Sequence, residues 1–169
     1  GPKGIGFLYA SSADFDSYLH GGDQEQKKRA GTENLAAIVG MVAALKEDLE
    51  QQAEHYQKLE GLKSAFLDEI ADLEYYLNES QHQLPYVINI GFPVQKNDLL
   101  LLRLDLEGIS ISTGSACTAG IVQTSHVLEA FYGSDSHRLT ESVRISLSPL
   151  NTEEELKQLA QTLKNIIGD

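Results

Sequence analysis

Residues 142–167 read SVRISLSPLNTEEELKQLAQTLKNII, an alternating stretch followed by a polar turn and a helical pattern. In the alternating stretch, Val143 and Ile145 point to one side of an extended strand, while polar residues point to the other side. Thr152 and Glu155 have the spacing of a capping box at the start of a helix. The apolar residues of this helix recur at every third or fourth position: Leu156, Leu159, Leu163 and Ile166. This pattern predicts a half-buried strand that leads into an amphipathic helix.

The first half of the chain adds one long helix to this mixture. The turn residues of GPKG precede an apolar run at residues 5–9, which predicts a short buried strand. Apolar residues then recur at helical spacing from the mid-thirties to Leu73. Gly40 and Gly61 are the points where this predicted helix is weakest.

The second half alternates strands with shorter helices. Strand composition occurs at residues 75–78, 85–92 and 109–112. Helices are predicted at residues 97–108, with Asn97 as a candidate N-cap and Gly108 as a candidate stop, and at residues 125–133. We therefore expect an α/β chain whose residues from about 75 onward form a compact α+β unit.

Composition and charge narrow the possible functions. The chain has 169 residues and a formal net charge of -12, which disfavours nucleic acid and anionic membranes as partners. Its single cysteine excludes an internal disulfide and a cysteine cluster for zinc, and its five histidines lack metal-ligand spacing. No apolar run approaches the roughly 18 residues of a membrane span. We expect a cytoplasmic protein without a metal site, a membrane segment or direct contact to nucleic acid.

The single cysteine, Cys117, lies in ISTGSACTAGIVQTSHVLEAF, residues 111–131. All residues between Thr113 and Gly120 are small, so no large apolar side chain is present to bury the sulfur. Free cysteines are usually buried, whereas exposed thiols in reducing cells are often reactive. Two interpretations stay open from the residues alone: a tolerated surface cysteine, or a nucleophile on a mobile loop.

A second candidate site is QKKRAGTEN, residues 26–34. Three consecutive cations precede Gly31 and Thr32, close to the predicted start of the long helix. Helix N-termini bind phosphate through free N–H groups and the helix dipole, and nearby positive charge strengthens such a site. The alternative is that Thr32 only caps the helix and the cations are solvated.

Arg144 is the third candidate residue. It points to the polar face of the predicted strand, together with Ser142 and Ser146. If this face is exposed, Arg144 is an ordinary solvent-facing arginine. If the face lines a cleft, the guanidinium group is suited to bind both oxygens of a substrate carboxylate.

Together these stretches resemble the pyridoxal-phosphate-dependent cysteine desulfurases of the class-V aminotransferase family. The resemblance covers essentially the whole chain, in family order and spacing. The cysteine segment is similar to the long-loop branch of the family, which serves iron–sulfur cluster assembly and tRNA thiolation. The matching segments are GPKGIGFLY (1–9), HGGDQEQKKRAGTENLAAIVG (20–40), ISTGSACTAG with SHVLEAF (111–131) and VRISLSPLNTEEEL (143–156).

The resemblance implies a role for each candidate residue. Cys117 would be the nucleophile that removes sulfur from L-cysteine as a persulfide, with alanine as the other product. The sulfur would pass to an acceptor protein, either an iron–sulfur scaffold or a tRNA-thiolating enzyme. Arg144 would hold the substrate carboxylate. Thr32 would contact the phosphate of the pyridoxal 5'-phosphate of the other subunit, which implies a homodimer.

The resemblance also implies that part of the family pattern is missing. The lysine that binds the cofactor belongs to a Ser-x-His-Lys motif just before the GPKG turn, and Lys3 is only the turn lysine. We therefore expect a C-terminal part of a fold-type I pyridoxal-phosphate enzyme that is inactive by itself. In this view residues 1–44 are a remnant of the large domain, 45–74 a connecting long helix and 75–169 the small α+β domain with the cysteine loop.

Other functions are compatible with the sequence. A class-V aminotransferase or a selenocysteine lyase shares the scaffold, and Cys117→Ala in the intact protein would separate these enzymes from a desulfurase. A non-catalytic sulfur carrier would use only the small domain and Cys117.

Overall fold

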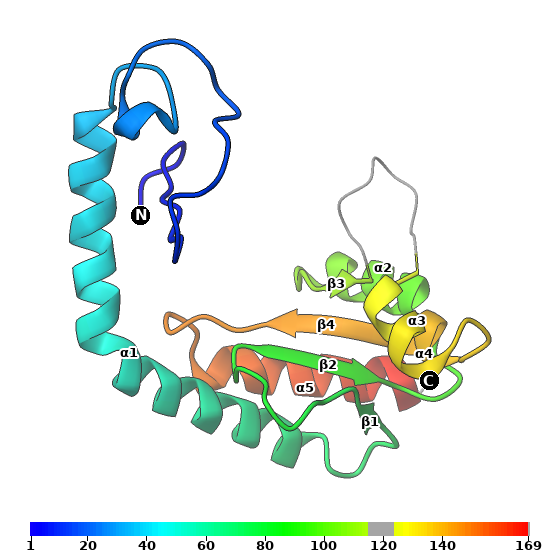
Figure 1. Ribbon diagram of the computed structural model, residues 1–169. Helices are drawn as coiled ribbons and strands as arrows, with labels where there is room; N and C mark the ends of the chain where they lie inside the picture. The colour runs from blue at the N-terminus through cyan, green and yellow to red at the C-terminus, as the bar shows by residue number, and fades with distance from the viewer. Residues whose placement is uncertain (115–123, 169) are drawn as a thin grey trace. The chain divides into compact units, whose positions relative to one another are not determined.

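The computed structural model of the chain describes residues 1–114 and 124–168 (Figure 1). The chain divides into two compact units, Gly1–Ala53 and Glu54–Asp169. Helix α1, Leu35–Glu69, begins in the first unit and ends in the second. The predicted combination of helices and sheet is confirmed. None of the helices in the described ranges has both the length and the hydropathy to cross a membrane.

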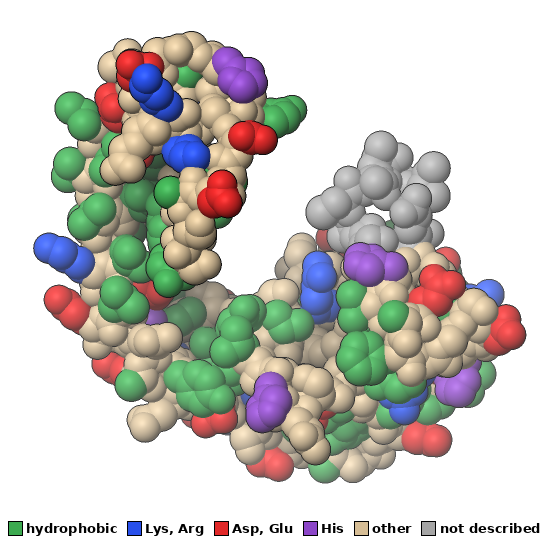
Figure 2. All heavy atoms as spheres, viewed as in Figure 1, with side chains coloured by type: hydrophobic (Ala, Val, Ile, Leu, Met, Phe, Trp, Pro, Cys, Tyr) green, Lys and Arg blue, Asp and Glu red, His purple; other side chains and the backbone are tan. Residues whose placement is uncertain are grey.

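The first unit has little regular structure besides α1. It contains one short 3-10 helix, η1, Glu25–Lys27. None of its residues is buried, and Figure 2 shows hydrophobic side chains at its surface. The prediction of a buried strand at residues 5–9 is wrong, since Phe7, Leu8 and Tyr9 are 70, 76 and 85 % exposed. A strand needs a hydrogen-bonded neighbour, and no described segment of the chain pairs with these residues.

Helix α1 is continuous through both glycines that were expected to weaken it. Gly40 has a packing role, because a Cβ atom at this position would lie 3.1 Å from Cγ of Pro2. No atom within 4 Å would meet a Cβ at Gly61. The helix ends at Glu69, and Leu73 lies in the turn that follows.

The second unit is built on a four-stranded sheet. Its strands are β1, Tyr76–Leu77; β2, Val87–Gly91; β3, Ser112–Thr113; and β4, Ser142–Ser146. They lie in the order β1-β2-β4-β3, and each neighbouring pair is antiparallel. β1, β2 and β4 lie within stretches predicted as strands. β3 begins at the last residue of the strand predicted at residues 109–112.

One face of the sheet contributes to the hydrophobic core of this unit. Ile88 pairs with Ile145 and Ile90 pairs with Val143, and all four side chains are at most 5 % exposed. The C-terminal part of α1 and helix α5, Glu153–Gly168, belong to the same core (Figure 1). Their buried residues are Leu59, Leu62, Phe66, Leu156, Leu159, Ala160, Leu163 and Ile166.

The capping box predicted for α5 is confirmed. The backbone N–H of Glu155 donates to Thr152 Oγ1 at 3.3 Å, and the backbone N–H of Thr152 donates to Glu155 Oε2 at 3.1 Å. A hydrogen bond from the Asn151 side chain, together with this backbone bond, lowers the pKa of the Glu155 carboxyl. The charged form of Glu155 therefore supports the start of the helix.

The N-cap predicted for the helix at residues 97–108 is wrong. Helix α2 spans Asn97–Leu106, and Asn97 is its first residue rather than its cap. The Asn97 side chain is buried and donates to the carbonyl oxygens of Leu139 at 3.3 Å and Ser142 at 3.1 Å. Gly108 does stop this helix, with φ at 76°. The Asn97 side chain therefore makes hydrogen bonds to a distant segment of the chain instead of capping its own helix.

Two short helices precede β4. Helix α3, His126–Tyr132, is capped by Ser125, whose Oγ accepts from the backbone N–H of Leu128 at 3.3 Å, and it ends at Gly133. Both ends agree with the predicted helix at residues 125–133. Helix α4, Arg138–Glu141, was not predicted and runs directly into β4.

Candidate functional site

A row of four polar residues crosses the other face of the sheet. Asn89 in β2 and Ser112 in β3 are the cross-strand partners of Arg144 in β4. Asn78 extends the row beyond β1, because its backbone N–H donates to the Asn89 carbonyl oxygen at 2.9 Å. We call these four residues the polar row. It confirms the alternation predicted for β4, since the neighbours of Arg144 in the strand are buried.

Ser112 holds the Arg144 side chain within the polar row. Arg144 Nε donates to Ser112 Oγ at 3.0 Å. The same hydroxyl group donates to the backbone carbonyl oxygen of Arg144 at 3.3 Å. The guanidinium group is thus attached to the edge strand β3.

The positive charge of Arg144 has no acidic partner among the described residues, although the chain has 25 Asp and Glu. Its Nη1 and Nη2 groups have no hydrogen-bond acceptor there either. The side chain is nevertheless half-buried. A partly buried guanidinium without a counter-ion favours an external anion, and a carboxylate matches its planar shape.

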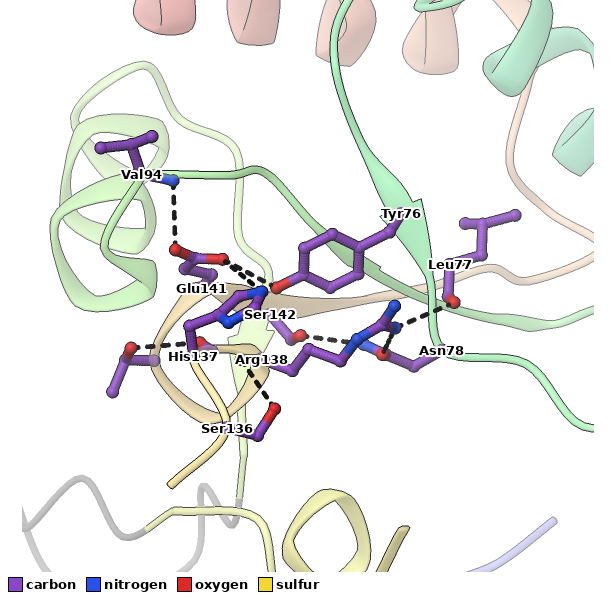
Figure 3. A network of polar contacts seen from close by, with 10 residues as sticks. Tyr76, Leu77, Asn78, Val94, Ser136, His137, Arg138, Glu141 and Ser142 are labelled. Atoms are coloured by element: carbon purple, nitrogen blue, oxygen red, sulfur yellow. Dashed lines mark hydrogen bonds and ion pairs between the residues drawn. The ribbon is translucent and has the colours of Figure 1, made fainter. Parts of the chain in front are cut away.

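Arg138 in α4 is a contrasting case, because its guanidinium group is engaged within the chain. Its Cζ atom lies 4.1 Å from the centroid of the Tyr76 ring and 4.5 Å from that of Tyr132. Nη1 donates to Asn78 Oδ1 at 2.6 Å and to the Leu77 carbonyl oxygen at 3.4 Å (Figure 3). Arg138 is thus a structural residue.

Glu141 fixes the segment that enters β4. Its Oε2 atom accepts from the Tyr76 hydroxyl at 3.0 Å, and its Oε1 atom accepts from the backbone N–H of Val94 at 3.1 Å (Figure 3). The pKa of Tyr76 is raised to about 12, mainly by burial, with a contribution in the same direction from the hydrogen bond to Glu141 and an opposing one from Ser142. The neutral tyrosine therefore binds β1 to the start of the strand that carries Arg144.

Cys117 lies outside the described residues, but the segments on both sides of it are described. On one side is β3, which contains Ser112, and on the other side is the α3 cap, Ser125. Strand β3, whose Ser112 side chain hydrogen-bonds Arg144, is therefore also the strand that leads into the cysteine segment. The fold brings Arg144 to this strand from a distant part of the sequence.

The three cations of residues 26–34 contact different groups of the chain. Each of them has a separate local partner in the first unit. The partners are Asp23 for Lys27, at 3.8 Å, the Phe15 carbonyl oxygen for Lys28, at 2.6 Å, and the Ala30 carbonyl oxygen for Arg29. The Arg29 guanidinium group lies beside the residue that precedes Thr32, because a Cβ atom at Gly31 would be 2.7 Å from Arg29 Nη1.

The N–H groups near Thr32 are partly occupied as well. The backbone N–H of Gly31 donates to Gln24 Oε1 at 3.0 Å. Asn34 rather than Thr32 caps α1, because its Oδ1 atom accepts from the backbone N–H of Ala37 at 3.2 Å. Thr32 is exposed, and its hydroxyl group has no partner in the described part of the chain. The backbone N–H groups of residues 32–34 also have no hydrogen-bond acceptor in the described part of the chain, and phosphate binding at this segment stays a prediction.

Ser112 is the site residue that the sequence analysis missed. The alternation of ISIS at residues 109–112 places Ser110 and Ser112 on one face of a strand, and this was the available signal. Only the strand register shows which of the two serines pairs with Arg144.

The chain is similar to known proteins over nearly its full length. Residues 1–159 match the family described as Aminotransferase class-V. IscS 1 of Bacillus subtilis (strain 168) is 44 % identical over 171 residues, covering 99 % of this chain and 45 % of the relative. The cysteine desulfurase IscS of Dictyoglomus turgidum is 37 % identical over 171 residues, covering 99 % and 43 %. The chain spans less than half the length of these curated relatives.

Solved structures agree with this similarity. The NifS-like protein from Rickettsia africae has a TM-score of 0.77 at 26 % identity, covering 91 % of this chain and 40 % of that one. Another NifS-like protein has a TM-score of 0.76 at 28 % identity, covering 90 % and 39 %. Because the family match extends over residues 1–159, the chain belongs to the class-V aminotransferase family.

Proposed function

We propose that this chain supplies the substrate-carboxylate site and the sulfur-accepting cysteine of a pyridoxal-phosphate-dependent cysteine desulfurase. The observation that carries the proposal is the attachment of Arg144, a half-buried arginine without an acidic partner in the described ranges, to the strand that leads into the Cys117 segment. The name of the similar Dictyoglomus turgidum protein, cysteine desulfurase, supports it further.

In this function Arg144 binds the α-carboxylate of L-cysteine through its Nη1 and Nη2 groups. The Cys117 thiolate attacks the sulfur atom of the substrate. A sulfur–sulfur bond forms at Cys117, the carbon–sulfur bond of the substrate breaks, and a proton replaces sulfur on that carbon. L-Cysteine and the Cys117 thiol thus give L-alanine and a Cys117 persulfide, without an external oxidant or reductant.

Pyridoxal 5'-phosphate, when bound, withdraws electrons from the substrate and so weakens its carbon–sulfur bond. The Thr32 hydroxyl group would donate a hydrogen bond to the phosphate of the cofactor in the other subunit of a homodimer. It would be one of several groups that bind this phosphate. No lysine of the printed sequence follows a Ser-x-His motif, so we propose that this chain does not turn over cysteine without further residues. Its sulfur acceptor would be an iron–sulfur scaffold or a tRNA-thiolating protein.

The test uses the cofactor-loaded protein in which this chain is joined to the residues that supply the cofactor lysine. This protein is incubated with L-cysteine, and both products are measured. We expect alanine, together with a gain of about 32 Da on the peptide that contains Cys117. Cys117→Ala should abolish both products when a thiol reductant is present for turnover. Alanine formation that survives this substitution would contradict the nucleophile assignment.

Other products would identify a different function. A keto acid in place of alanine would indicate an aminotransferase. Preference for selenocysteine over cysteine would indicate a selenocysteine lyase. A mass gain that comes only from a persulfidated donor protein, with no alanine, would indicate a sulfur carrier. Each of these results would overturn the proposed function.

A further inference from the structure

One hydroxyl group, that of Ser112, contacts Arg144 at two points. It accepts a hydrogen bond from Arg144 Nε at 3.0 Å and donates one to the backbone carbonyl oxygen of Arg144 at 3.3 Å. The two residues are also cross-strand partners in the register of β3 and β4. The hydroxyl group thus uses its one proton and one of its two lone pairs on Arg144, and it fixes the inner end of the guanidinium group.

The other neighbour of Arg144 in the polar row is engaged elsewhere. Asn89 Oδ1 accepts from Asn78 Nδ2 at 2.8 Å, and Asn78 Oδ1 in turn accepts from Arg138. Among the described residues, Ser112 is the side chain that hydrogen-bonds the guanidinium group. The orientation of this group therefore depends on a single serine hydroxyl.

The contact at Nε decides which edge of the guanidinium group is free. A planar guanidinium can bind a carboxylate at two points through its Nε–Nη edge or through its Nη1–Nη2 edge. Because Ser112 occupies Nε, only the Nη1–Nη2 edge remains for a two-point contact. We propose that Ser112 is a positioning residue that directs this edge of Arg144 toward the substrate carboxylate. This inference rests on the proposed function and adds a residue to its site.

The kinetic test compares three serine variants of the cofactor-loaded protein. Ser112→Ala should raise KM for L-cysteine about tenfold, as expected for a lost hydrogen bond to a charged group, and leave kcat within about twofold. Ser112→Thr keeps the hydroxyl group and should restore KM. Ser110→Ala is the matched control, because Ser110 lies in the same segment, is exposed and does not contact Arg144.

A spectroscopic measurement on the isotope-labelled chain tests the contact without catalysis. The Arg144 Nε–H signal, assigned from its loss in Arg144→Lys, should be protected from exchange with water. It should shift and lose protection in Ser112→Ala, and it should remain in Ser112→Thr and Ser110→Ala. An unchanged signal in Ser112→Ala would overturn the positioning role.

Arg144→Ala separates failure of this inference from failure of the proposed function. If Arg144→Ala raises KM strongly and Ser112→Ala does not, the role of Ser112 is wrong and the proposed function stands. If neither substitution changes KM, Arg144 does not bind the substrate and both proposals fall. If Ser112→Ala lowers kcat instead of raising KM, the serine acts in the chemical step and the positioning role is wrong.

Discussion

The two halves of helix α1 have the same apolar spacing but very different surroundings. In the first unit Leu45 and Leu49 are 40 and 60 % exposed, whereas in the second unit Leu62 and Phe66 are 4 and 0 % exposed. The periodic pattern of the sequence does not change between these positions. What differs is the presence of a sheet and of α5 in the second unit. An amphipathic pattern thus predicts that a helix has an apolar face, but not what covers it.

The two units also differ in how many of their residues are buried. All buried residues of the described chain belong to the second unit, and none belongs to the first. Stability from hydrophobic burial is therefore concentrated in residues 54–168. The polar row lies on the sheet of this same unit, so Arg144 is supported by a packed core.

The largest effect that distinguishes the units is expected from two phenylalanine substitutions. Phe66→Ala in the second unit should lower the free energy of unfolding by about 3–5 kcal/mol, because it leaves a cavity at a fully buried position. Phe7→Ala is the matched control in the first unit, where the ring is 70 % exposed, and it should change this free energy by less than about 0.5 kcal/mol. Urea unfolding followed by tyrosine fluorescence measures both, and equal losses would contradict the contrast.

Two asparagine substitutions should give the next largest difference. Asn97→Ala leaves the buried carbonyl oxygens of Leu139 and Ser142 without this donor, and it should cost about 2–3 kcal/mol of unfolding free energy. Asn34→Ala removes only the cap of α1, which should cost about 1 kcal/mol of local helix stability. Hydrogen exchange should report the second effect in the first turn of α1 alone. Loss of protection throughout the second unit in Asn34→Ala would argue that the units are not independent.

Some features of the fold could be predicted from the sequence and others could not. The alternation of β4, the capping box of α5 and the stop at Gly108 were predicted correctly, since each depends on residues close in the chain. The strand at residues 5–9 and the N-cap at Asn97 were wrong, because each depends on what distant segments offer. Local patterns predicted individual elements more reliably than their burial.

The candidate site divides in the same way. The polar direction of Arg144 follows from alternation within one strand, and the structure confirms it. Its contact with Ser112 depends on the pairing of β3 with β4, which no local pattern specifies. The phosphate site expected at Thr32 stays a prediction, and the three cations that precede it contact different groups of the first unit. The role of Cys117 stays a prediction.

A smaller effect is expected from the hydroxyl group of Tyr76. Tyr76→Phe should cost about 1 kcal/mol through loss of the bond to Glu141. Because folding raises this pKa from 10.0 to about 12, the contribution of the neutral tyrosine is complete below pH 10.0 and is lost as the pH rises through about 12. Unfolding free energies measured across this range should fall less steeply in Tyr76→Phe. Identical slopes in both proteins would contradict the assignment.

The smallest effect is expected at the start of α5. The depressed pKa of Glu155 means that its charged form stabilises the helix above the ordinary value of 4.5 and that this support is lost as the pH falls through the lower folded value. Glu155→Gln should flatten this acid dependence. Hydrogen exchange in the first turn of α5, measured over the acid range, checks it. An acid dependence that is the same in Glu155→Gln would assign the effect to another carboxylate.

The structure of the cofactor-loaded protein with the product L-alanine bound would test the proposed carboxylate site most directly. We predict that both carboxylate oxygens lie about 3 Å from Nη1 and Nη2 of Arg144, with Nε still bonded to Ser112 Oγ. A carboxylate bound by another residue, with the Arg144 guanidinium group facing solvent, would contradict the central role assigned to this strand.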